Sequence, residues 1–275
     1  MGACHSVANY FLAPADEFVE PRRGHSVVAR RPEVGEMAGT TSELRAVIFD
    51  FFGTLVDEVN RFRDPMLQEV SRIFGIDYDS FLAAFQSTDN PRSLGLYRDT
   101  EENLVDVCVK LGLHPEMEVI KLAANAFRSG FLSQMEPRPD ALETIQSLKD
   151  RGLSIGLVSN INLEGPRLWG KTPFAPVIDV AIFSSVVRLT KPDPRIFQLA
   201  LEGLRVTTGQ CIYVGDGGSG ELQAARALGM QAVMVRTNYV EDTYYLDEHV
   251  WPGPRIQTLR EVLKLLPSGI LRDTK

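Results

Sequence analysis

From residue 140 onward, short apolar segments alternate with amphipathic ones, and this alternation constrains the fold more than any other feature of the chain. The apolar segments, each of strand length, are residues 154–158, 180–183, 211–214 and 232–235. Helical patterns lie between them. Apolar strands that are joined by helices form parallel sheets, which helices cover on both faces. The sequence therefore predicts an α/β fold with a parallel sheet and three layers, α/β/α.

Residues 58–138 show helical patterns and no strand pattern. Asp64 and Pro65 suit the N-cap and the first position of a helix, and Gly75 suits its end. Further helices are expected from about residue 79, over 100–111 and over 115–131. We therefore predict a mobile tail over residues 1–43 and a sheet core over residues 44–57 and 139–275. An all-helical block, residues 58–138, is inserted into the core.

Composition excludes several classes of partner. The 275 residues carry a formal net charge of −7 without a basic stripe, which argues against nucleic acid as a partner. The apolar runs are far shorter than the ~20 residues that a membrane span needs. The 3 cysteines are scattered, which favours reduced thiols in the cytoplasm. We expect a cytoplasmic protein that acts on a small molecule, and the sequence leaves a homodimer open.

The first six residues, MGACHS, match the pattern for N-terminal myristoylation and include a cysteine for a second acyl chain. Matches of six residues arise easily by chance. A functional start at Met37, just before the first strand, is the plainer interpretation.

Polar residues follow the apolar strands. Residues 45–49 end at Asp50, and Gly53 and Thr54 then suit a tight turn. A carboxylate on rigid backbone there can act as a nucleophile or a metal ligand, although an aspartate that only caps a turn gives the same pattern. The later strands are followed by Ser159, Asn160, Lys191 and Asp216. Ligands of parallel α/β sheets bind beyond the carboxyl ends of the strands, so we expect these groups to share one site.

This set of residues suits attack on phosphorus, or on a carbon that carries a leaving group. Ser159 can donate a hydrogen bond to a transferring oxygen, and Lys191 can offset negative charge. Asp50 and Asp216 can together hold a hard cation through oxygen atoms. Taken singly, each residue also fits a turn, a solvated charge or a loop.

Four segments together resemble the motifs of the haloacid dehalogenase-like (HAD) superfamily of hydrolases. They are Phe49–Leu55, Leu157–Asn160, Lys191–Phe197 and Val214–Asp216, and they occur in the family's order. The resemblance spans about residues 45–265. It implies a Rossmann-like core, a helical cap of the C1 type and a covalent intermediate on Asp50. We also predict substrate contacts at Phe52, Thr54 and Asn160. The resemblance is compatible with a Mg²⁺ site formed by Asp50, Asp216, Glu221 and the backbone carbonyl of Phe52.

The chain departs from the family's phosphatases at Phe52. They carry a second aspartate there, which protonates the leaving group and then activates water. Losing a general acid/base of this kind typically costs about 10²–10⁴ in rate. Asp57 or Glu58 could take its place, but their geometry does not follow from the sequence.

An aromatic residue at position 52 resembles the 2-haloacid dehalogenase branch, which has Tyr there and needs no metal because a halide leaves without protonation. That branch, however, has Tyr where this chain has Phe197, and usually Ser and Asn around the position of Asp216. A charged Asp216 would repel a halide and a carboxylate. The sequence therefore favours a bound cation and a phosphorylated substrate.

Two further segments carry patterns with a possible function. Residues 215–220, GDGGSG, satisfy the dinucleotide-binding pattern G-x-G-x-x-G, but Asp216 inside the loop would repel a pyrophosphate. Residues 90–98 are the best candidate for substrate contact in the helical block. Arg92 and Arg98 could pair there with an anionic group, although a solvated loop is the plainer interpretation.

Three hypotheses follow from the sequence. The first is a Mg²⁺-dependent HAD hydrolase that acts on a small phosphorylated metabolite. The second is a dehalogenase-like, carbon-centred hydrolase, and the third is a catalytically impaired binding protein, which Phe52 supports.

Overall fold

The computed structural model describes residues 43–57, 64–236 and 251–267. The chain divides into two units, Met1–Glu43 and Leu44–Lys275, and the fold below is that of the second unit. The predictions of a mobile tail, a lipidated N-terminus and a start at Met37 lie outside the described residues.

Six parallel strands form one sheet, in the order β3-β2-β1-β4-β5-β6. They are β1 Ala46–Phe49, β2 Ser154–Ser159, β3 Val180–Phe183, β4 Cys211–Gly215, β5 Gln231–Val235 and β6 Arg255–Ile256. All four residues of β1 are buried between β2 and β4. The strand order reverses between β1 and β4, which is where ligands bind in open α/β sheets. The predicted parallel sheet is confirmed, and the two-residue β6 is an addition to it.

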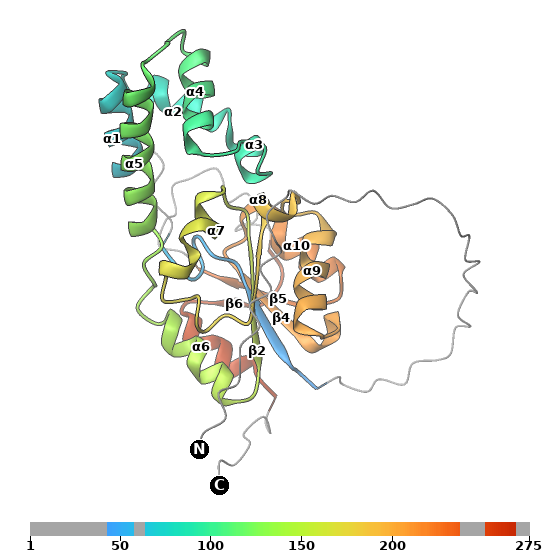
Figure 1. The fold of residues 1–275 in the computed structure, drawn as a ribbon. Helices are drawn as coiled ribbons and strands as arrows, with labels where there is room; N and C mark the ends of the chain where they lie inside the picture. Colours follow the sequence, from blue (N-terminus) through green and yellow to red (C-terminus); the bar gives the residue numbers. More distant parts are fainter. Residues whose placement is uncertain (1–42, 58–63, 237–250, 268–275) are drawn as a thin grey trace, which may run out of the picture. The chain divides into compact units, whose positions relative to one another are not determined.

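Helices cover both faces of the sheet, as predicted. The main ones are α6 Ala141–Asp150, α9 Pro194–Leu204 and α10 Glu221–Ala227. Val47 of β1 belongs to the hydrophobic core on the face of α6, and Ile48 belongs to the core on the face of α9 and α10. Figure 1 shows these helices on opposite sides of the sheet. The alternation of side chains along each strand therefore produces the three layers.

No strand lies among the described residues between the turn after β1 and α6, where five helices follow one another. They are α1 Pro65–Phe74, α2 Tyr78–Gln86, α3 Asp89–Ser93, α4 Thr100–Lys110 and α5 Met117–Ser133, with α1 packed along α5 (Figure 1). Asp64 caps α1 as predicted, and Gly75 ends it with φ of 67°. The short α3 lies where the sequence predicted a loop, because Pro91 fits within a first helical turn. The block's boundaries at residues 58 and 138 stay a prediction.

Shorter elements complete the described fold. They are α7 Glu164–Leu168, α8 Ser184–Val187, and the 3₁₀ helices η2 Trp169–Lys171, η3 Thr208–Gln210, η4 Gly218–Gly220 and η5 Leu259–Leu265. None of the helices in the described ranges is both long and apolar enough to cross a membrane.

The two connections between the sheet and the helical block run side by side. Val56 and Pro137 form an antiparallel bridge, and the N–H of Arg138 donates to the carbonyl of Leu55 at 2.9 Å. The Arg138 guanidinium also donates to the carbonyl of Gly53 at 3.3 Å. The entry to the block and the exit from it are therefore tied to the turn that follows β1.

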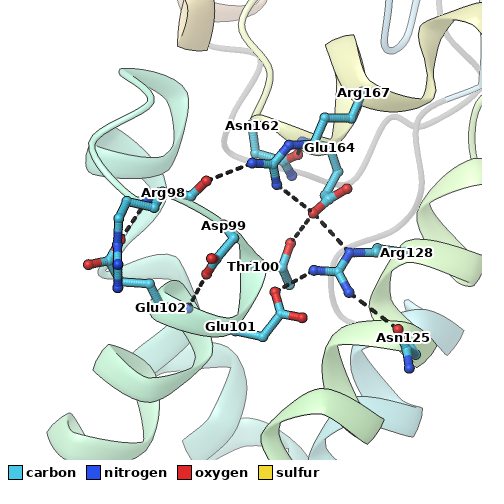
Figure 2. A network of polar contacts seen from close by, with 10 residues as sticks. All are labelled: Arg98, Asp99, Thr100, Glu101, Glu102, Asn125, Arg128, Asn162, Glu164 and Arg167. Atoms are coloured by element: carbon cyan, nitrogen blue, oxygen red, sulfur yellow. Dashed lines mark hydrogen bonds and ion pairs between the residues drawn. The ribbon is translucent and has the colours of Figure 1, made fainter. Parts of the chain in front are cut away.

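A buried carboxylate, Glu164 of α7, also joins the helical block to the sheet side of the fold. Its Oε1 accepts hydrogen bonds from Thr100 Oγ1 at 2.6 Å, from Arg128 Nε at 3.1 Å and from Arg167 Nη1 at 3.3 Å (Figure 2). Arg128 in addition pairs with Glu101. Because Thr100 lies on α4 and Arg128 on α5, one carboxylate bridges two helices of the block to the segment after β2.

Candidate active site

A cavity of about 230 Å³ lies where the ends of the strands meet the helical block. Asp50 and Asp216 follow β1 and β4, Ser159 ends β2, and all three line the cavity. The opposite wall comes from the helical block. The predicted site residues in the lining are Asp50, Phe52, Arg92, Ser159, Asn160, Lys191, Asp216 and Glu221. The fold thus brings together groups that are up to 171 positions apart in the sequence, from Asp50 to Glu221.

Asp50 is held in place from three sides. Its N–H donates to the carbonyl of Val214 at 2.9 Å, which fixes the backbone where β1 ends. Lys191 Nζ donates to its Oδ1, and Thr54 Oγ1 lies 3.3 Å from its Oδ2. Thr54 is fully buried, so in this structure it orients Asp50. The carboxylate is therefore fixed and charge-compensated, as a nucleophile or a cation ligand must be.

Lys191 is a buried cation between two carboxylates. Its Nζ donates to Asp50 and to Glu221, and only 6% of the residue is exposed. Burial by itself lowers the pKa of Lys191, but the two carboxylates outweigh it and raise the pKa above its usual value. Asn160 holds the backbone of Lys191, accepting from its N–H at 2.8 Å and donating to its carbonyl at 3.2 Å. Lys191 is thus always charged at physiological pH.

Glu221, the first residue of α10, is fully buried. Its Oε2 accepts from Lys191 Nζ and from Tyr213 Oη, the latter at 2.7 Å, and its Oε1 accepts from the N–H of Gly217 at 3.2 Å. Burial, together with the nearby charge of Asp50, raises the pKa of Glu221 to about 7, although Lys191 opposes this shift. Glu221 is therefore an internal carboxylate fixed by three donors.

Asp216 lies against the turn that follows β1. Its Oδ1 accepts from the N–H of Gly218 at 2.8 Å. A Cβ atom on Gly53 would lie only 2.0 Å from Asp216 Oδ2, and Gly53 has φ of +75°. Both the backbone conformation and the close approach therefore require glycine at position 53.

The three carboxylates fit a divalent cation. Oxygen atoms of Asp50, Asp216 and Glu221 all lie within 4.8 Å of one another. Oxygens bound to a single Mg²⁺ lie at most about 4.2 Å apart, so small side-chain movements would complete the site. Three carboxylates and the Lys191 ammonium carry a formal charge of −2, which a divalent cation would balance.

Ser159 offers an unused hydrogen-bonding group to the cavity. The residue is 1% exposed, and no donor or acceptor among the described residues bonds to its Oγ. A buried hydroxyl without a partner costs free energy, about 1–3 kcal/mol, unless a ligand satisfies it. The Ser159 hydroxyl therefore still has its hydrogen-bonding capacity at the edge of the cavity.

Phe52 places an apolar ring at the position where the family's phosphatases carry a second aspartate. Its ring centroid lies 5.1 Å from that of Phe51 and 5.9 Å from that of Phe131 on α5. Asp57, one candidate to replace the missing acid, has a side chain 68% exposed, pairs with Arg138 at 3.8 Å and does not line the cavity. Glu58, the other candidate, lies outside the described residues.

The two arginines of the helical block differ in placement. Arg92 lines the cavity, and its guanidinium pairs with Asp89, donates to the carbonyl of Phe85 at 2.9 Å and stacks on the Phe85 ring. Arg98 has a side chain 82% exposed and pairs with Glu102 outside the cavity lining. The structure therefore brings Arg92 to the site and leaves Arg98 away from it.

The family model for haloacid dehalogenase-like hydrolases matches residues 44–229, which is more than half of the chain. The chain belongs to this family. It is thus an enzyme of the hydrolase class, and each of the four segments by which the sequence resembles the family contributes at least one residue to the cavity lining.

Curated relatives of this HAD hydrolase include several that are named phosphatases. A phosphatase of Mycobacterium tuberculosis is 28% identical over 209 residues, which is 70% of this chain and 87% of the relative. A phosphorylated carbohydrates phosphatase of Thermotoga maritima is 24% identical over 80% of this chain and 100% of its own length.

Solved structures resemble the HAD hydrolase in fold. A phosphatase from Thermococcus onnurineus has a TM-score of 0.55 and 24% identity, covering 81% of this chain and 97% of its own. An L-2-haloacid dehalogenase from Xanthobacter autotrophicus, solved with chloropropionic acid covalently bound, has a TM-score of 0.57 and 20% identity, covering 81% and 98%. Both branches share this architecture, so the fold alone does not choose between them.

Tyr213 and Asp64 are among the residues of the site that the sequence did not reveal. Tyr213 lies inside β4, where a tyrosine is typical of a hydrophobic core, and only the structure shows its hydroxyl on Glu221. Asp64 was predicted as a helix cap, and the structure also places it in the cavity lining.

Proposed function

We propose that this enzyme hydrolyses a small phosphorylated metabolite, a phosphate monoester, with Mg²⁺ as cofactor and Asp50 as nucleophile. The observation that carries the proposal is the buried cluster of Asp50, Asp216 and Glu221, which together with the Lys191 ammonium has a formal charge of −2. A divalent cation would balance this charge. Once the cation is bound, the cavity attracts a phosphate dianion instead of repelling it.

Each residue of the site has its own role in phosphoryl transfer. Asp50 attacks phosphorus, while Ser159 Oγ and Lys191 Nζ donate hydrogen bonds to phosphoryl oxygens where negative charge accumulates. Asn160 holds the backbone of Lys191 in position. Asp50, Asp216 and the Phe52 carbonyl would hold Mg²⁺, with Glu221 supporting them. When bound, the ion would offset charge on the phosphoryl group.

The relatives that carry phosphatase names support this choice of reaction. Asp216 supports it as well, because a carboxylate at that position repels a halide or a substrate carboxylate in the absence of a cation. One observation favours a second candidate function, a metal-free hydrolysis at carbon. Phe52 places an aromatic ring where the dehalogenase branch has one.

The experiment is a panel of phosphorylated and 2-halogenated small molecules, assayed with Mg²⁺ and with a chelator. We expect release of inorganic phosphate that a chelator abolishes and that Asp50→Asn lowers to background. The Asn variant preserves shape but removes the nucleophile. Release of halide that persists in chelator would replace the proposal with the second candidate. If a phosphorylated compound bound without turnover, and Asp50→Asn left binding unchanged, the chain would be a binding protein.

A further inference from the structure

A phosphate monoester of an alcohol needs a proton for its leaving oxygen, and Phe52 cannot supply one. Five carboxylates line the cavity in the described part of the chain, and three of them, Asp50, Asp216 and Glu221, form the cluster that fits a cation. The remaining two, Asp64 and Asp89, both belong to the wall formed by the helical block. Asp89 pairs with Arg92, and its side chain is 43% exposed.

Asp64 differs from Asp89 in burial and in the use of its two oxygens. The residue is 6% exposed. Its Oδ1 accepts from the N–H of Met66 at 2.8 Å, from the N–H of Leu67 at 3.4 Å and from Gln134 Nε2 at 2.9 Å. No described donor bonds to Oδ2. One oxygen therefore anchors the carboxyl group, and the other is available to a molecule in the cavity.

The location of Asp64 matches the path of the leaving group. In an in-line displacement the leaving oxygen departs on the side of phosphorus opposite the nucleophile. Asp50 lies on the wall formed by the strand ends, and Asp64, the N-cap of α1, lies in the wall formed by the helical block. A substrate whose phosphoryl group contacts Asp50 and Ser159 therefore extends its alcohol portion toward the helical block and Asp64.

The environment of Asp64 also favours its protonated form. Burial raises the pKa of Asp64, and the hydrogen bonds from Gln134, Met66 and Leu67 only partly oppose the shift. A raised pKa is the property that allows a carboxyl group to act as a proton donor near neutral pH.

We propose that Asp64 is the catalytic acid and base of this enzyme, in the place of the carboxylate that is absent at position 52; this rests on the proposed phosphatase function. An Asp50 oxygen forms a bond to phosphorus, the bond from phosphorus to the ester oxygen breaks, and that oxygen takes the Asp64 proton to give the alcohol. The Asp64 carboxylate then takes a proton from water as the water oxygen attacks phosphorus. The bond from phosphorus to Asp50 breaks, which releases phosphate and restores both carboxyl groups.

Asp64→Asn tests the proposal without removing the helix cap, because Asn caps helices as well as Asp does. Asp77→Asn is the matched control, since Asp77 caps α2 through the N–H of Ser80 at 2.9 Å and does not line the cavity. Asp64→Ser, which also retains a capping oxygen, provides a second variant if the first does not fold.

The measurement is kcat/KM for two esters, an alkyl phosphate and p-nitrophenyl phosphate, because this ratio reports the steps up to release of the alcohol. Nitrophenolate leaves without protonation, whereas an alkoxide does not. We expect Asp64→Asn to lower kcat/KM for the alkyl ester by about 10²–10⁴ and to change that for the aryl ester by less than about tenfold. With the aryl ester, Asp64→Asn should also give a burst of nitrophenolate, because hydrolysis of the phosphorylated Asp50 has lost its base.

Equal losses of kcat/KM for the two esters in Asp64→Asn would show that Asp64 has a role in binding or folding, and would overturn the proposal. Unchanged activity toward the alkyl ester would overturn it as well. In both cases a wild type that hydrolyses the esters would leave the proposed function standing. If the wild type hydrolyses neither ester, the proposed function fails and the role of Asp64 fails with it.

Discussion

Gly53→Ala perturbs the contact between the turn after β1 and Asp216. The added Cβ would lie 2.0 Å from Asp216 Oδ2, whereas real Cβ atoms essentially never come within 3.0 Å of a neighbouring atom. The difference between these two distances means that Oδ2 must move by about 1 Å. A displacement of that size at a reacting centre can lower turnover by about 10²-fold.

Gly75→Ala is the matched control for this change. Gly53 has φ of +75° and Gly75 has φ of +67°, so alanine introduces backbone strain of about 1–2 kcal/mol at either position. Around Gly75, however, no atom lies within 4 Å of the added Cβ. We expect both variants to lose about 1–2 kcal/mol of unfolding free energy through backbone strain, with a further loss in Gly53→Ala from the clash with Asp216. Only Gly53→Ala should lose affinity for Mg²⁺ and turnover.

Urea unfolding, calorimetric titration with Mg²⁺ and the rate of phosphate release together test this expectation. The reasoning is refuted if Gly53→Ala keeps the wild-type Mg²⁺ affinity and turnover. It is also refuted if Gly75→Ala loses as much Mg²⁺ affinity and turnover as Gly53→Ala, because the loss would then come from backbone strain and not from Asp216.

Three further predictions concern other parts of the molecule. Glu164→Gln should lower the unfolding free energy by about 1 kcal/mol, because the amide keeps one acceptor for Thr100 but loses the charge facing Arg128 and Arg167; urea unfolding with no change in midpoint would contradict this. Phe52→Asp should raise phosphatase turnover more in the Asp64→Asn variant than in the wild type, since it restores a carboxyl group near the leaving oxygen; equal effects in the two backgrounds would argue against this. Burial raises the pKa of Cys108 to about 11 and that of Cys211 to about 12, so iodoacetamide should modify these thiols in urea but not in the native protein, as judged by mass spectrometry.

The fold followed from the sequence where patterns were long and regular. Strands β1 to β5 and helices α1, α4 and α9 lie close to the predicted residues, because burial of one face imposes a period on the sequence. Strand β6 has two residues, which is too few to show a period. The short α3 contains Pro91, and its first residues could equally have formed a turn.

The residues at the strand ends were predictable because a parallel sheet forces its carboxyl ends to one edge. The roles of Tyr213 and Asp64 were not. Gln134, which holds Asp64 in the cavity wall, lies 70 positions away in the sequence, so this contact depends on the packing of α1 against α5. The pairing of Arg92 with Asp89 likewise became visible only with α3 in place.

Trapping the phosphoryl group on Asp50 is the most direct test of the proposed chemistry. The enzyme would be mixed with a phosphate monoester that it hydrolyses and with Mg²⁺, quenched in acid, reduced with borohydride and digested for mass spectrometry. We expect reduction of residue 50 to homoserine, which depends on both substrate and Mg²⁺. Phosphate release without any modification at Asp50 would contradict the assignment of this carboxylate as the nucleophile.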